Sequence, residues 1–198
     1  MIAIKPLVRM LGLAVLFALA APVQAHETAL GAGSGEALPF NLGGPWSLID
    51  HNGQPRTRED FRGEYRIIFF GYTACPYTCS TAMTNLAVAL DELADDGNRM
   101  GGLFFTIDPV YDTPERLADY LRPIHPRFLG LTGAADEIDR LQKSFQVHAK
   151  EAADKGSFER LIDHQPLGFL MGPEGDILTL FPPLLPPSEI ARIIRGYL

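Results

Sequence analysis

The most informative stretch of the sequence runs from residue 66 to residue 79 and reads RIIFFGYTACPYTC. Residues 66–72 form an apolar run of the length of a buried strand. After Cys79, apolar residues recur at spacings of three and four, at Met83, Leu86, Leu90 and Leu93. That spacing is typical of the buried face of a helix. Both cysteines therefore lie where a strand gives way to a helix.

The two cysteines are predicted to lie at the N-terminus of this helix. Pro76 suits the first helical position, because the N–H that proline lacks would be unpaired there anyway. Cys75 would then be the N-cap, with Cys79 one turn further on. Residues four apart face the same side of a helix, with Cβ atoms roughly 5–6 Å apart. Helix N-termini stabilise anions, so we expect at least one thiol to have a lowered pKa.

Such a thiol pair is suited to redox chemistry or to a soft metal. Its spacing is also close to what a disulfide tolerates. A purely structural staple is the alternative interpretation. That staple would close a very short loop and would therefore stabilise the fold little.

The rest of the chain predicts alternating strands and helices. Trp46 to Asp50 reads as a strand that enters an Asn-Gly turn, and residues 102–108 (GLFFTID) read as a second buried strand. Asp112 and Glu115 are expected to cap a helix that opens around Pro114. The further elements are a strand at 128–131, a helix at 138–145, a hairpin at 167–181 and a helix from 187. This order predicts an α/β fold of thioredoxin-like plan, with a mixed central sheet flanked by helices and an N-terminal β-hairpin.

Composition narrows the function classes. The chain has 198 residues, 46% of them hydrophobic, which is enough for a single core. Lys and Arg number 17 against 24 Asp and Glu, a net charge of −7, which argues against nucleic-acid binding. With only two cysteines, the chain is not a disulfide-dense scaffold and cannot by itself form a four-cysteine zinc site.

The N-terminus reads as a targeting segment. Lys5 and Arg9 precede an apolar run from residue 10 to residue 23, which is short of the roughly 20 residues of a membrane span. Small residues at positions 23 and 25 predict cleavage after Ala25. We therefore expect a signal peptide at 1–25, a flexible leader at 26–37 and one domain at 38–198. The mature protein would be exported to the periplasm; an uncleaved N-terminal membrane anchor is the alternative.

Four motifs occur in a fixed order along the chain. They are the segment Phe70–Thr73 followed by Cys75-Pro76-x-x-Cys79; residues 106–109 (TIDP) with 112–115 (DTPE); residues 131–133 (LTG); and Asp163-His164, followed by 169–170 (FL) and 173–175 (PEG). From about Leu38 to Leu198 the chain resembles the SCO/SenC family of copper-handling, thioredoxin-like proteins. The resemblance implies that Cys75, Cys79 and His164 are copper ligands.

This ligand set is chemically reasonable. Two thiolates and one imidazole form a soft, three-coordinate set that suits Cu(I), whereas zinc would prefer a fourth ligand. Cu(II) could bind with a further group completing the site. The sequence departs from the family pattern at Tyr77, where an acidic residue is usual, at Ser80 (usually proline) and at Gln165 (usually serine). These changes spare the three ligands, and the first of them, at Tyr77, removes a negative charge from beside the thiolates.

The other histidines are expected to play lesser roles. His51 lies in a hairpin turn and is predicted to be solvated, His125 to be structural, and His148 to be exposed or helix-capping. His26 would be the mature N-terminus, where amine and imidazole together form a secondary candidate copper chelate.

The sequence also predicts where three further side chains near the motifs lie. Asp108 ends a strand near the cysteine turn and is a candidate to face the site. Tyr72 and Tyr77 flank the motif and are candidates for an exposed docking surface.

The sequence is compatible with two functions. The first is a copper chaperone that delivers copper to the dinuclear centre of cytochrome c oxidase, whose copper-bearing subunit would be the partner. The second is a thiol–disulfide oxidoreductase that uses Cys75 and Cys79 as a redox dithiol. A thiol peroxidase fits poorly, because such an enzyme has threonine three residues before its cysteine, and Thr73 is two before Cys75. A non-catalytic structural domain would leave the motifs unexplained.

Overall fold

The structure is a computed structural model that describes residues 38, 40–94, 100–152 and 161–198. The predicted signal peptide (1–25) and leader (26–37), with His26, lie outside the described residues. Among the described residues, no helix combines the length and the apolar character that crossing a membrane requires.

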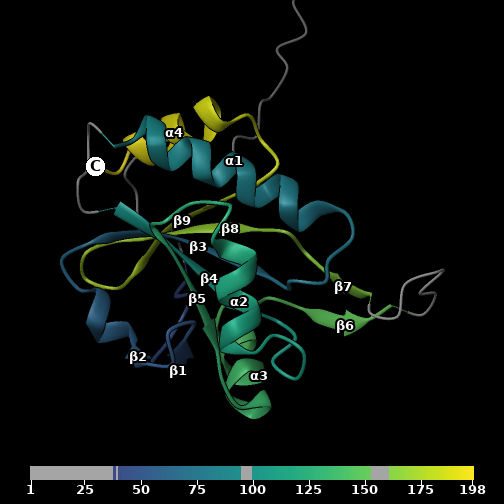
Figure 1. Cartoon of the computed structure of the whole chain (residues 1–198). Helices are drawn as coiled ribbons and strands as arrows, with labels where there is room; N and C mark the ends of the chain where they lie inside the picture. The colour runs from purple at the N-terminus through teal and green to yellow at the C-terminus, as the bar shows by residue number, and fades with distance from the viewer. Residues whose placement is uncertain (1–37, 39, 95–99, 153–160) are drawn as a thin grey trace, which may run out of the picture.

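A seven-stranded sheet forms the centre of the domain (Figure 1). Its strands lie side by side in the order β2-β1-β5-β4-β3-β8-β9. Neighbours β3, β4 and β5 are parallel, and the other pairings are antiparallel. The strands are β1 (Ser47–Asp50), β2 (Pro55–Thr57), β3 (Tyr65–Gly71), β4 (Met100–Thr106), β5 (Phe128–Thr132), β8 (Gly168–Met171) and β9 (Ile177–Phe181). The mixed sheet and the N-terminal β1–β2 hairpin are therefore as predicted.

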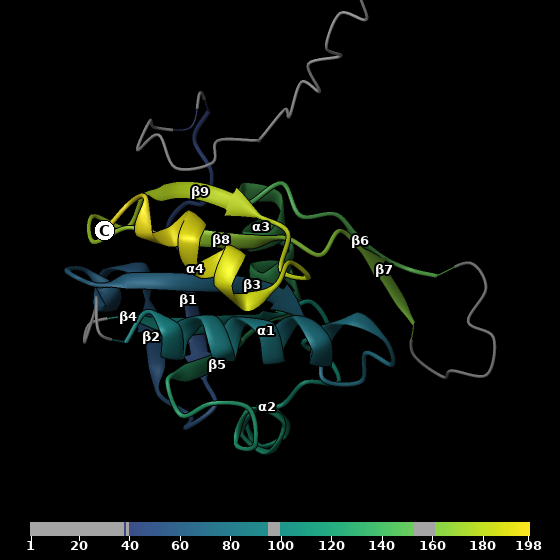
Figure 2. The ribbon, with the colours of Figure 1, turned by 90° about the horizontal axis from the view of Figure 1, so that it is seen from above.

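Helices cover both faces of this sheet. They are the short 3-10 helix η1 (Arg58–Phe61) and the α-helices α1 (Thr78–Glu92), α2 (Pro114–Leu121), α3 (Ala135–Ser144) and α4 (Pro187–Arg195). Helices α1 and α4 run side by side in Figures 1 and 2. They are joined by a hydrogen bond from the Arg195 guanidinium to the Glu92 carbonyl at 2.8 Å.

Aromatic side chains of β3 and β4 fill the core on either side of the sheet. Phe69 pairs in register with Phe104, and Phe70 with Phe105. Because successive side chains on a strand point to opposite faces, the two pairs lie in the core on opposite sides of the sheet. Phe104 packs against Tyr120 of α2, with ring centroids 5.5 Å apart. On the other face, Phe105 packs against Phe145, the residue after α3, at 6.1 Å.

The apolar runs at 66–72 and 102–108 are thus central parallel strands, which are buried on both faces and carry no polar alternation. The glycine at 102 also has a steric role. A Cβ at Gly102 would lie 2.0 Å from the Phe128 ring, so the glycine leaves room for that ring between β4 and β5.

A second, two-stranded sheet extends away from the body of the domain (Figures 1 and 2). It consists of β6 (Ala149–Glu151) and β7 (Ile162–His164), paired antiparallel with Ala149 opposite His164. The sequence did not predict this hairpin, which we call the β6–β7 arm. Its strands are only three residues long and largely polar, so they lack the apolar pattern by which strands are recognised.

Candidate metal centre

Cys75 and Cys79 lie where β3 leads into α1, as predicted, but the local geometry differs from the prediction. The helix begins at Thr78 with Tyr77 as its N-cap, so Cys75 is not the N-cap and Pro76 is not the first helical residue. The N–H of Cys75 instead bonds to the Tyr72 carbonyl at 3.2 Å, which makes residues 72–75 a turn. Cys79 is 1% exposed, whereas Cys75 is half-buried.

The two thiols are free and form a coupled pair. The Cys79 S–H hydrogen-bonds to the Cys75 sulfur, and the backbone N–H groups of Tyr77, Thr78 and Cys79 also point to it. These donors outweigh burial and lower the pKa of Cys75 to about 4. The same hydrogen bond, together with burial, raises the pKa of Cys79. At neutral pH the pair is therefore a thiolate at Cys75 and a protonated thiol at Cys79.

This asymmetry predicts selective alkylation. At pH 6 an ordinary cysteine is less than about 1% thiolate, whereas Cys75, with a pKa of about 4, is almost fully ionised. Because the thiolate is the nucleophile, iodoacetamide at pH 6 should modify Cys75 and leave Cys79 intact. The rate should stay level between pH 6 and pH 8 and fall as the pH drops through 4. Peptide mapping by mass spectrometry measures both sites.

The control for this experiment is the unfolded chain. In denaturant at pH 8.5 both thiols should react alike, because the donors around Cys75 are lost. Equal modification of the two cysteines in the folded protein at pH 6, or faster modification of Cys79, would contradict the assignment of the thiolate.

Tyr72, the first residue of the cysteine turn, is only 1% exposed. The prediction of an exposed docking surface was therefore wrong for this residue, which belongs to the core because it continues the buried strand β3. Tyr77, by contrast, is 61% exposed. The Tyr72 hydroxyl accepts a hydrogen bond from the N–H of Ile162 at 3.2 Å, which links the cysteine turn to β7.

His164 is the last residue of β7 and is half-buried. Its ring packs edge-on against Tyr72, with centroids 6.3 Å apart. Burial lowers the pKa of His164, so the imidazole is neutral at pH 7. Its Nδ1 atom is buried and has no hydrogen-bond partner among the described residues.

The structure thus brings the two cysteines together and places His164 close by, across Tyr72. The Cys75 thiolate acts electrostatically on the imidazole. In the described part of the chain, however, no three His, Cys, Asp or Glu side chains are arranged as a ready metal site. The three predicted ligands therefore lie near one another but do not form a complete metal site in the described residues.

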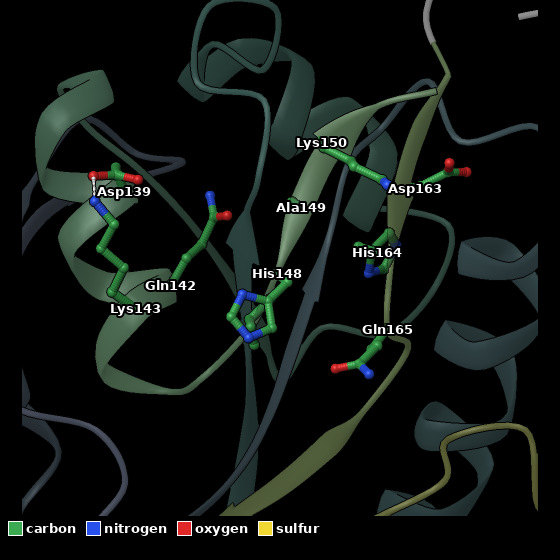
Figure 3. A pocket seen from close by; sticks show the side chains of 10 residues that line it. Asp139, Gln142, Lys143, His148, Ala149, Lys150, Asp163, His164 and Gln165 are labelled. Carbon is green, nitrogen blue, oxygen red and sulfur yellow. Dashed lines mark hydrogen bonds and ion pairs between the residues drawn. The ribbon is translucent and has the colours of Figure 1, made fainter. Parts of the chain in front are cut away.

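A pocket of about 600 Å³ opens beside His164, between α3 and the β6–β7 arm (Figure 3). His148 and Gln165 also line it. His148 is exposed, as predicted. Asp163, the neighbour of His164, is exposed as well, consistent with the alternation of side chains along a strand. Solvent and small solutes therefore reach the side of the site that carries the histidine.

Asp112 is a supporting residue that sequence reasoning placed wrongly. The N-cap of α2 is Thr113, and Glu115 lies in the first turn of the helix. Asp112 itself is fully buried. Its carboxylate accepts hydrogen bonds from the Thr73 N–H at 3.1 Å, the Thr73 hydroxyl at 2.5 Å and the Thr106 hydroxyl at 2.6 Å. It therefore anchors the turn before Cys75 to the end of β4, and burial raises its pKa.

Asp108 and two histidines complete the comparison with the predicted residues. Asp108 is buried and lines a neighbouring cavity of about 580 Å³ together with Ile162. His51 is not a solvated turn residue, because its Nδ1 accepts a hydrogen bond from the Gly130 N–H at 3.0 Å. His125 is structural, as predicted: its ring contacts Asp91 at 3.0 Å and packs against Phe128.

Comparison with known proteins gives consistent matches. A family model described as SCO1/SenC matches residues 34–198. Protein sco1 of Schizosaccharomyces pombe is 35% identical over 159 residues, which cover 79% of this chain and 60% of that protein. The human protein SCO1 homolog, mitochondrial, is 31% identical over 159 residues, 79% of this chain and 53% of that protein. The chain thus spans between half and three-fifths of these two relatives.

Solved structures agree with the sequence relatives. Bradyrhizobium japonicum ScoI with copper bound is 33% identical with a TM-score of 0.71, covering 79% of this chain and 99% of that one. Arabidopsis thaliana ScoI with copper bound is 29% identical with a TM-score of 0.73 and the same coverage. The fold is therefore the thioredoxin-like fold of the Sco structures, and by both sequence and structure this chain belongs to the SCO1/SenC family.

Proposed function

We propose that this protein binds copper through Cys75, Cys79 and His164 and delivers it to the copper-bearing subunit of cytochrome c oxidase during assembly. The observation that carries the proposal is the donor set. It comprises a thiolate at Cys75, a second thiol in hydrogen-bond contact with it, and a neutral imidazole whose buried Nδ1 lacks a partner. Soft sulfur donors with an imidazole suit Cu(I).

The partly assembled site is consistent with a cargo rather than a permanently held ion. Copper would replace the proton on Cys79 and occupy the unpartnered nitrogen of His164. Copper binding would thereby bring together the three ligands, which the fold places near one another without forming a complete metal site. Two solved relatives at 29% and 33% identity are described with copper bound, which supports copper as the cargo here.

The role in oxidase assembly is supported by the family. A solved structure at 22% identity, BsSco, is described as a member of the Sco family of cytochrome c oxidase assembly proteins. We infer an exported, periplasmic location from the predicted signal peptide, with an uncleaved membrane anchor as the alternative. Mitochondrial relatives and a bacterial lipoprotein relative are consistent with a site of action outside the bacterial cytoplasm.

Copper stoichiometry tests the proposal most directly. The mature protein, purified and reduced, should retain one Cu(I) per chain after gel filtration, as measured by metal analysis. After oxidation of its thiols it should retain none, because a disulfide offers no thiolate. The oxidised protein is the matched control, since its sequence is unchanged and only the state of the two thiols differs. Less than one tenth of a copper per reduced chain would refute the proposal.

A second candidate function is thiol–disulfide exchange, which the lowered pKa of Cys75 favours. The Cys75 thiolate would attack a substrate disulfide and form a mixed disulfide, releasing one substrate thiolate. Cys79, once deprotonated, would then attack Cys75, forming the Cys75–Cys79 disulfide and releasing the second substrate thiol. An external dithiol reductant would have to restore the pair. This function uses the same two sulfurs but does not need His164.

A further inference from the structure

One residue of the cysteine turn contacts all three proposed ligands. The Tyr72 backbone hydrogen-bonds to the Cys79 sulfur, and the Tyr72 carbonyl accepts the N–H of Cys75. The Tyr72 hydroxyl interacts with the Cys75 side chain, and the ring packs edge-on against His164. Tyr72 thus lies between the sulfur donors on the body of the domain and the nitrogen donor on the β6–β7 arm.

The hydroxyl makes the connection between these two parts. It accepts the N–H of Ile162 at 3.2 Å, two residues before His164 on β7. Ile162 pairs with Glu151 of β6, so a hydrogen bond to its backbone links the domain body to the paired strands of the arm. Since Tyr72 is 1% exposed, water cannot easily replace this hydroxyl if it is removed.

We propose that Tyr72 is a positioning residue for copper: its hydroxyl bonds to the backbone of Ile162 and to Cys75, and thereby holds the arm so that His164 faces the thiols. This inference rests on the proposed copper-binding function. It adds a residue that contacts no metal itself but fixes the place of the third ligand. Groups that orient metal ligands typically change metal affinity by about 10–100-fold when they are removed.

The variant Tyr72→Phe tests the inference, because it keeps the ring and removes only the hydroxyl. Cu(I) affinity, measured by competition with a chelator, should fall by about 10-fold or more. In the copper-free reduced protein, amide hydrogen exchange at Ile162 should accelerate, while the amides of β3 and β4 keep their protection. A general loss of stability would instead accelerate exchange throughout the sheet.

Tyr120→Phe is the matched control. The Tyr120 hydroxyl is also buried and within the electrostatic reach of both thiols, but it has no hydrogen-bond partner among the described side chains. Its removal should leave both copper affinity and exchange at Ile162 unchanged.

A double variant separates positioning from direct effects on sulfur. If Tyr72 acts through His164, Tyr72→Phe should weaken copper binding in the wild-type background but add little in a His164→Ala background. Equal effects in both backgrounds would overturn the inference, as would unchanged affinity and exchange in Tyr72→Phe. If wild-type protein binds no copper, the proposed function fails, and exchange at Ile162 still decides whether the hydroxyl holds the arm.

Discussion

Cys75→Ser is expected to abolish tight Cu(I) binding. The substitution replaces the thiolate, which is ionised at neutral pH because its pKa lies near 4, with a hydroxyl that remains protonated and is a poor ligand for a soft ion. Loss of a ligand itself should exceed the roughly 10–100-fold typical of residues that only orient ligands. Competition with a Cu(I) chelator measures the affinity, and circular dichroism verifies the fold.

Two neighbouring substitutions show whether the loss of copper is specific to the sulfur pair. Cys79→Ser should also lose tight copper binding, but it should keep a thiol at Cys75 that is still alkylated. Ser80→Ala is the matched control, because Ser80 is exposed on the same turn of α1 and its side chain contacts neither thiol in any described interaction. Stoichiometric, chelator-resistant copper in Cys75→Ser would show that the sulfur pair is not the site.

His164→Ala should separate the two candidate functions. It removes the only proposed nitrogen ligand but leaves the coupled thiols, so copper affinity should drop by more than about 100-fold while reduction of a disulfide substrate continues at a similar rate. Cells carrying the variant should lose oxidase activity if copper delivery is the physiological task. The two readouts are chelator competition on purified protein and oxidase activity in cells that lack the wild-type gene.

His148→Ala is the control for this variant, since His148 lines the same pocket but is exposed and is not a proposed ligand. If affinity falls in His164→Ala while oxidase activity stays normal, copper delivery is not the task in cells and thiol exchange takes its place. If affinity does not fall, His164 is not a ligand.

The central strands and helices were predictable because the spacing of their apolar residues indicates which faces are buried. Phe69, Phe70, Phe104 and Phe105 lie in short continuous apolar runs, which are typical of strands covered on both faces. The β6–β7 arm was not predictable on this basis. Its residues are mostly polar, and its three-residue strands are too short to show an apolar alternation.

The site was predictable to a similar extent. The position of the cysteines between strand and helix followed from the sequence around them, whereas the identity of His164 depended on resemblance to a family. Asp112 was misplaced, because an acidic residue before Thr113-Pro114 looks like a helix cap. Its burial depends on Thr73 and Thr106, which lie 39 and 6 residues away and offer hydroxyl partners only once the chain has folded.

The placement of His164 on an arm outside the main sheet has a thermodynamic consequence. Two of the proposed ligands lie where β3 leads into α1, while the third lies on the β6–β7 arm, a separate sheet that Tyr72 links to the domain. If the arm docks and undocks as a unit, only the docked form presents all three ligands together. The apparent dissociation constant of such a site is its intrinsic value divided by the fraction of molecules in which the arm is docked. Each change of about 1.4 kcal/mol in docking free energy, once the docked form is the minority, shifts the apparent affinity tenfold. Substitutions in the arm, or a partner that pulls on it, can therefore set how readily the ion is released without altering any atom that binds it.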